Sequence, residues 1–182
     1  MSYKNTMLIS PTKVKQYAVV GLNVDENVLG ECIRIAHIHV GEVVGRRLME
    51  RLQELVYNKI KGETANTIDD QDKIQYKTLL DDYLTPALAY ATAVEAAVIN
   101  ELKIRNMGVV RNSDVNVNSV GGNEYTYLAT YTKTYLNDAY NRIVEFLCQE
   151  KAGFPELPDG FCTCSSKPLY ANTGLWLGPN KH

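Results

Sequence analysis

The sequence predicts a mostly α-helical fold: a bundle of about four to five helices, with an extended arm or loop before the last helix and an irregular C-terminal tail. Apolar residues recur at three- and four-residue spacing over most of the chain, which is the pattern of amphipathic helices. The chain has 182 residues, of which 45% are hydrophobic and 22% charged. These values are typical of a globular domain that buries its own core without disulfides or metals.

The first predicted helix is short. Ser10 is a favourable N-cap, and Pro11 suits the first helical position because its missing N–H would have no partner there. A helix of one or two turns is therefore expected from Thr12 to Tyr17.

Two longer helices follow. Asn23-Val24-Asp25 opens a helix whose apolar residues continue to Val40. Gly41 and Gly45 bracket a predicted break, and the next helix extends to about Ile60. The residues from 61 to 67 are polar and predict a linker.

A third helix is expected from Gln71 to Tyr83. Thr85 and Pro86 then have the residue types of an N-cap and a first helical position, so we predict that a new helix begins there. It runs to about Asn106 and is rich in alanine, which lets other helices approach closely. We therefore place it at the centre of the bundle.

The arm is expected at residues 109–122. Valine alternates with Asn or Asp from Asp114 to Val120, a period of two that is typical of a strand. A long non-helical insertion in a helical protein is usually functional or disordered. We expect the arm to contact a neighbouring subunit, with a loosely held loop as the alternative. The candidate contact residues are Val109, Val110, Arg111, Asn112, Val115, Val117 and Val120.

The last helix is expected from about Asn123 to Lys151, which closes a helical domain of residues 1–153. Residues 154–182 contain repeated Gly and Pro, which exclude long regular elements. They also contain large apolar side chains, so we expect a tail that docks on another protein, although it could instead fold back on its own bundle. Its candidate anchors are Phe154, Phe161, Tyr170, Leu175, Trp176 and Leu177.

No metal site is predicted. His37 and His39 are two residues apart, so on a helix their side chains point about 200° from each other and cannot share an ion, even with Glu42 nearby. Cys162 and Cys164 lack the second ligand pair of a structural zinc site.

No catalytic or cofactor-binding residues are predicted either. The pairs Asp69-Asp70 and Asp81-Asp82 are expected beside helix starts, where carboxylates offset the helix dipole. Gly121-Gly122 lacks the surrounding motif of a phosphate-binding loop and predicts a hinge. We expect that the protein is not an enzyme.

The composition also restricts the partners. The formal net charge is −2, whereas proteins that bind nucleic acid tightly carry a basic excess. Tyrosine is abundant, with 12 residues against 3 Phe and 1 Trp, and its ring with a polar tip suits partly wet interfaces. No signal-peptide or membrane-spanning pattern is evident, and the four cysteines are expected to stay reduced, so a soluble protein made in a cytoplasm is predicted.

Several segments resemble, in order, the head-to-tail connector proteins of crAss-like and related Bacteroidetes tailed phages. The resemblance covers roughly residues 8–156 and is one of pattern, without a catalytic signature. The segments that carry it are Leu8-Ile9-Ser10, Asn23-Val24-Asp25-Glu26, Ile35-Ala36-His37, Val43-Val44-Gly45 with Leu48, Leu80 to Tyr90, Lys103 to Val110, and Tyr140 to Cys148.

The resemblance implies a small helical subunit of the virion neck. Such subunits form a closed ring, commonly of twelve copies, beneath the portal protein, and they contact other neck and tail proteins. They carry no catalysis, and DNA passes through the lumen without specific binding. The residues after Phe154 depart from the pattern of the family.

Two other functions remain open at this point. A helical-bundle enzyme or ligand-binding protein would need polar groups facing inward, for which the predicted central helix offers only Glu95, Asn100 and Glu101. A nucleic-acid-binding regulator would need a basic helix, but Glu50 and Glu54 interrupt the cluster of Arg46, Arg47 and Arg51.

Overall fold

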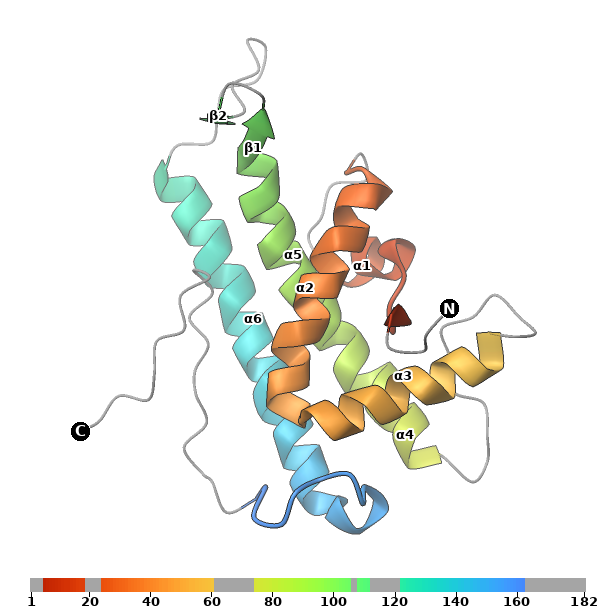
Figure 1. Cartoon of the computed structure of the whole chain (residues 1–182). Coiled ribbons are helices and arrows are strands. Elements are labelled where there is room, and N and C mark those ends of the chain that lie inside the picture. The colour runs from red at the N-terminus through yellow and green to blue at the C-terminus, as the bar shows by residue number, and fades with distance from the viewer. Residues whose placement is uncertain (1–4, 19–23, 61–73, 106–107, 112–121, 163–182) are drawn as a thin grey trace.

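The structure is a computed structural model, and it describes residues 5–18, 24–60, 74–105, 108–111 and 122–162. The fold is mostly helical, as predicted. Three long helices, α2, α5 and α6, lie side by side, and α3 crosses their line near one end (Figure 1). The helices are α1 (Pro11–Tyr17), α2 (Glu26–Val44), α3 (Arg46–Ile60), α4 (Ile74–Thr78), α5 (Thr85–Glu101) and α6 (Gly122–Gln149).

Helix α5 is the centre of the bundle, which confirms the prediction from its alanine content. It contacts α1, α2 and α6. Small side chains allow this because they let three neighbouring backbones approach the same helix. The buried alanines of α5 are Ala87, Ala89, Ala91, Ala93 and Ala96.

The predicted starts of α1 and α2 are confirmed by their capping hydrogen bonds. The Ser10 side chain accepts a hydrogen bond from the Lys13 backbone N–H at 3.3 Å, and the Asp25 carboxylate accepts one from the Asn27 N–H at 2.9 Å. Each bond satisfies an N–H that the first turn of a helix leaves unpaired.

The break between α2 and α3 occurs at Gly45 alone. Its backbone has φ 91° and ψ 137°, a conformation that L residues with a side chain rarely adopt. Gly41 lies inside α2, and its carbonyl accepts the Gly45 N–H at 3.0 Å.

The predicted boundary at Thr85 and Pro86 is wrong, because α4 and α5 form one continuous helix. A π-helical turn, η3 (Leu79–Leu84), joins them, and Thr85 is itself helical with φ −58° and ψ −49°. The Thr85 N–H bonds to the Leu80 carbonyl, five residues back, and the Thr85 hydroxyl donates to the same oxygen at 2.8 Å. In a regular α-helix the ring of Pro86 would clash with the carbonyl of residue 82, and the wider π turn relieves this clash.

The predicted end of the central helix near Asn106 is also wrong, because α5 ends at Glu101. Two short antiparallel strands follow, β1 (Leu102–Arg105) and β2 (Gly108–Arg111), with Leu102 opposite Arg111 and Arg105 opposite Gly108. Thus Val109, Val110 and Arg111 of the predicted arm pair with their own chain. The other predicted arm residues, Asn112, Val115, Val117 and Val120, lie outside the described residues.

The beginning of the C-terminal segment folds back on the bundle, beyond a short 3₁₀ turn, η4 (Lys151–Gly153). The side chain of Phe154 is only 1% exposed, and its ring packs edge-on against Tyr76 and Phe146, with centroids 5.2 and 6.0 Å away. Phe161 is partly buried against the same core. Phe154 is therefore a core residue and not an exposed docking anchor. The remaining predicted anchors, Tyr170, Leu175, Trp176 and Leu177, lie outside the described residues.

Candidate functional site

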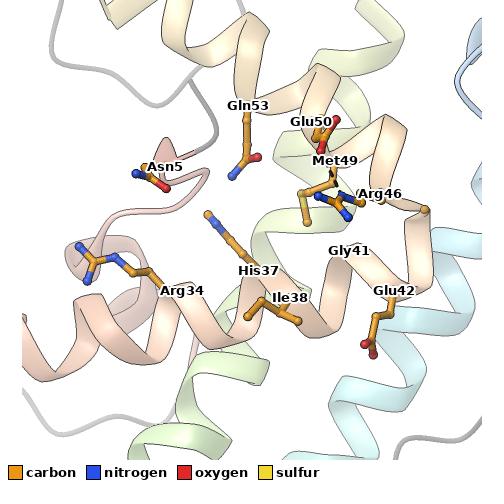
Figure 2. A pocket seen from close by; sticks show the side chains of 11 residues that line it. Asn5, Arg34, His37, Ile38, Gly41, Glu42, Arg46, Met49, Glu50 and Gln53 are labelled. Atoms are coloured by element: carbon orange, nitrogen blue, oxygen red, sulfur yellow. Dashed lines mark hydrogen bonds and ion pairs between the residues drawn. The ribbon is translucent and has the colours of Figure 1, made fainter. Parts of the chain in front are cut away.

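A groove of about 640 Å³ lies between α2, the first half of α3 and the segment before α1. Figure 2 shows His37 pointing from α2 into this groove, toward Gln53 on α3. Ile38, Gly41 and Met49 supply its apolar surface, and charged side chains stand at its rim. We call it the α2–α3 groove.

His37 is held as a neutral hydrogen-bond acceptor. The backbone N–H of Leu8 donates to its Nε2 atom at 3.2 Å. Burial lowers the pKa of His37 to about 4, because the charged ring is poorly solvated there. With Nε2 accepting, the ring proton of the neutral form is on Nδ1.

Gln53 binds the same segment from the other helix. Its Nε2 donates to the carbonyl of Thr6 at 3.1 Å, and its side chain is buried. His37 and Gln53 therefore attach residues 6–8 to α2 and α3, beside Leu8 and Ile9, which are completely buried in the core. Both of these polar side chains of the groove therefore bind the chain's own backbone.

The charged rim is mostly paired within single helices. Arg46 Nε lies 3.1 Å from Glu50 Oε1 on α3, and Arg34 pairs with Glu31 on α2. The Arg46 side chain is 87% exposed, so its pair with Glu50 adds little stability. Glu42 lies at the opposite end of the groove from Arg34 (Figure 2).

His39 lies in a different environment from His37, as their spacing predicted. Its Nε2 is 3.6 Å from Glu95 Oε1 on α5. The Glu95 carboxylate favours the protonated ring and raises the pKa of His39. In the described part of the chain, no group of three or more His, Cys, Asp or Glu side chains is placed to hold a metal.

The other candidate residues have varied positions. Asp81 and Asp82 lie in the π turn in the middle of a long helix, so the prediction that they offset a helix start is wrong. Cys32 is buried, which raises its thiol pKa to about 11, whereas Cys148 is half-buried and Cys162 exposed. Cys164, Asp69, Asp70 and Gly121 lie outside the described residues.

A second surface feature was missed by sequence reasoning. Tyr131 and Tyr135 on α6 are 44% and 43% exposed, and the Tyr135 ring stacks on Tyr90 of α5 with centroids 5.7 Å apart. The hydroxyl of Tyr131 donates to that of Tyr135 at 3.1 Å. We call Tyr90, Tyr131 and Tyr135 the tyrosine surface.

A signal for this surface exists in the spacing of α6. Leu136, Tyr140, Ile143 and Leu147 form its buried face. Tyr135 precedes Leu136 by one residue, which turns it about 100° away from that face, and Tyr131 lies one helical turn earlier on the same side as Tyr135. Tyrosine is compatible with a buried or an exposed position, so the residue type alone does not indicate which face it occupies.

None of the helices in the described residues is long and apolar enough to cross a membrane. A model of a protein family of unknown function, DUF6712, matches residues 41–165, which include α3 to α6. No curated protein and no solved structure matches the chain significantly.

Proposed function

The chain belongs to the family DUF6712, whose function is unknown, and we propose that it is a structural, non-enzymatic subunit of a phage head–tail connector. In this proposal, copies of the chain form a ring below the portal protein. This ring joins the capsid to the tail in the virion. Twelve copies are expected from the resemblance stated above.

The observation that carries the proposal is the exposed aromatic and aliphatic surface of the bundle. Besides the tyrosine surface, Ile38 on α2 is 64% exposed and Val98 on α5 is 38% exposed. Scattered exposed apolar residues are common, but stacked tyrosines are favoured at the centres of protein interfaces. A subunit that lies between two neighbours needs such surfaces.

Two further features support a ring. The β1–β2 hairpin lies beyond the ends of the long helices (Figure 1), at a position where it can reach a neighbouring subunit. The formal net charge of −2 also suits a lumen through which DNA passes without being retained.

The polar groups of the α2–α3 groove support a binding or structural role over catalysis. His37 and Gln53 bind the backbone of Leu8 and Thr6, and Arg46 pairs with Glu50. A general base needs a free lone pair within reach of a substrate proton, and the His37 Nε2 lone pair is already used.

One observation favours a second function, a helical-bundle protein that binds a small ligand. The volume of the α2–α3 groove, about 640 Å³, is in the range of small-molecule pockets, and its lining is largely apolar. A ligand that remains bound to the purified protein, identified by native mass spectrometry, would favour this function over the connector.

The decisive test is cryo-electron microscopy of virions of the phage that encodes this chain. A symmetric ring of the chain between portal and tail is the expected result. Absence of the chain from the purified particles would contradict the proposal.

A variant tests the role of the exposed tyrosines. Tyr131→Ser combined with Tyr135→Ser should reduce the yield of tailed particles at least tenfold, because the subunit interface loses its aromatic centre. Tyr17→Ser is a matched control, since Tyr17 is 45% exposed but lies on α1. Equal particle yields from the double variant and the control would show that the tyrosine surface is not part of the subunit interface.

A further inference from the structure

A second cavity, of about 260 Å³, lies between the α4–α5 helix and α6. Tyr83, Pro86 and Tyr90 line one wall, at the three- and four-residue spacing of one helical face. Tyr135 and Asp138 line the wall from α6, and Asp82 joins the site from the π turn. We call it the tyrosine–aspartate cavity.

The aromatic rings of this cavity are held in place by other rings. Tyr83 stacks on Phe146 with centroids 4.4 Å apart and an interplanar angle of 22°. Tyr90 and Tyr135, which both line the cavity, stack on each other with centroids 5.7 Å apart and an angle of 29°. Ordered tyrosine rings attract cations through their negative faces.

The charges of the cavity are unbalanced. Its one lining cation, Arg142, lies 2.9 Å from Asp138 through its Nη2 atom. Asp82 has no hydrogen bond or ion pair within the part of the chain that the structure describes. A carboxylate beside three tyrosine rings is thus available to an incoming cation.

We propose that this cavity receives an arginine side chain from a second copy of the chain, in the head-to-tail contact of the ring. The inference rests on the proposed function. A guanidinium is the best match, because its plane stacks on tyrosine while its N–H groups donate two parallel bonds to a carboxylate. The small volume admits one side chain and excludes a bulky ligand.

Among the arginines whose side chains the structure describes, Arg47 fits the requirement. Arg34, Arg46, Arg51 and Arg142 each form an ion pair with a carboxylate of the chain. Arg47 is exposed at the start of α3 and has no ion pair among the described residues. A closed head-to-tail ring joins two different surfaces of each subunit, so unpaired Arg47 and unpaired Asp82 can meet between neighbours.

The test is a charge swap in the phage. Four versions of the complete chain are compared: wild type, Asp82→Arg, Arg47→Asp, and the double variant. Tailed particles are counted by electron microscopy. Each single variant should lower the count at least tenfold by placing like charges together, and the double variant should restore it to within about threefold of wild type. Asp81→Arg is the matched control, because Asp81 does not line the cavity.

The outcomes separate this inference from the proposed function. Purified single variants should unfold at the wild-type temperature, since both side chains are exposed. Normal particle counts for the single variants would overturn the Arg47–Asp82 contact. So would a loss of particles that the double variant does not restore. In either case, a ring that is visible in wild-type virions would leave the connector function intact. Absence of the chain from wild-type virions would refute the connector function itself.

Discussion

At the scale of single residues, the two histidines of α2 show how the surroundings of a side chain decide its chemistry. His37 has a pKa of about 4, below its ordinary value of 6.5, because it is buried and accepts the Leu8 N–H. His39 has a raised pKa because Glu95 favours its protonated form. The stability contributed by neutral His37 is complete above pH 6.5 and is lost as the pH falls toward 4. The stability contributed by His39 depends on pH in the opposite way. It is present below the pKa of His39 in the unfolded chain, and it is lost as the pH rises through the raised pKa of the folded protein.

The pH dependence of His37 can be isolated by substitution. His37→Gln retains an acceptor for the Leu8 N–H but does not titrate. Between pH 7 and pH 5 the free energy of unfolding of the wild type should fall by about 2 kcal/mol more than that of the variant, since each pKa unit corresponds to about 1.4 kcal/mol. Urea denaturation at both pH values measures this difference. His39→Gln is the control. It should remove a stabilisation that is strongest at low pH, so its unfolding free energy should fall more than that of the wild type between pH 7 and pH 5. An equal fall in wild type and His37→Gln would show that His37 is not buried as a neutral acceptor.

At the scale of elements, the irregular backbone at the π turn and at Gly45 decides which side chains line the two candidate sites. The π turn η3 admits Pro86 into a continuous helix, and in doing so it directs Asp82 and Tyr83 toward α6. Gly45 separates α2 from α3, so that α3 turns away from the direction of α2 (Figure 1). Residues of both helices then line the groove into which His37 points (Figure 2).

The two glycines of this junction should respond differently to alanine. Gly45→Ala should lower the free energy of unfolding by about 1–3 kcal/mol, because its φ of 91° is strained for any residue with a Cβ, although nothing lies within 4 Å of that Cβ. Gly41→Ala should be neutral or stabilise by up to about 1 kcal/mol, because alanine favours the helix. Its Cβ would meet Met49 Cγ at an ordinary 3.7 Å. Thermal and urea unfolding measure both, and equal effects would contradict the assigned backbone of Gly45.

At the scale of the whole molecule, the segment after α6 completes the core. The Tyr76 hydroxyl donates to both carboxylate oxygens of Glu156, at 3.0 and 2.9 Å, and Arg51 approaches Glu156 at 3.8 Å. Burial raises the pKa of Tyr76 to about 12, so it stays a donor. Phe154 and Leu157 are buried beside this contact. Residues distant in the sequence thus join α3, α4 and the end of the chain's described part into one unit.

Removal of Phe154 tests this closure. Phe154→Ala should lower the free energy of unfolding by about 3–5 kcal/mol, the range for a large aromatic side chain lost from a core. The purified chain should still unfold in one transition, which urea denaturation followed by circular dichroism detects. Phe161→Ala should cost less, because that ring is only partly buried. If Phe154→Ala were as stable as the wild type, the assignment of Phe154 to the core would be wrong.

Local sequence signals were sufficient to predict most helix positions. Ser10 and Asp25 cap helices through bonds to residues two or three positions away, and the break at Gly45 depends on its own backbone freedom. The alanine content of α5 predicted its central position for a similar reason, because close packing depends on the small size of each side chain. All of these features are set within a few residues of the chain.

Other features were decided only by the tertiary structure. Pro86 normally begins or breaks a helix, but here the helix continues through the π turn, whose Leu79, Leu80 and Leu84 are buried in the core. Phe154 could serve as an anchor or as core, and Tyr76 and Phe146, far away in the sequence, decide for the core. The same holds for both candidate sites, since the partners of His37 and the walls of the tyrosine–aspartate cavity come from separate elements. By itself, the sequence determined where most of the helices lie, because capping and helix propensity are local. Which side chains meet was decided by the tertiary structure, because burial and electrostatics depend on neighbours that only folding brings together.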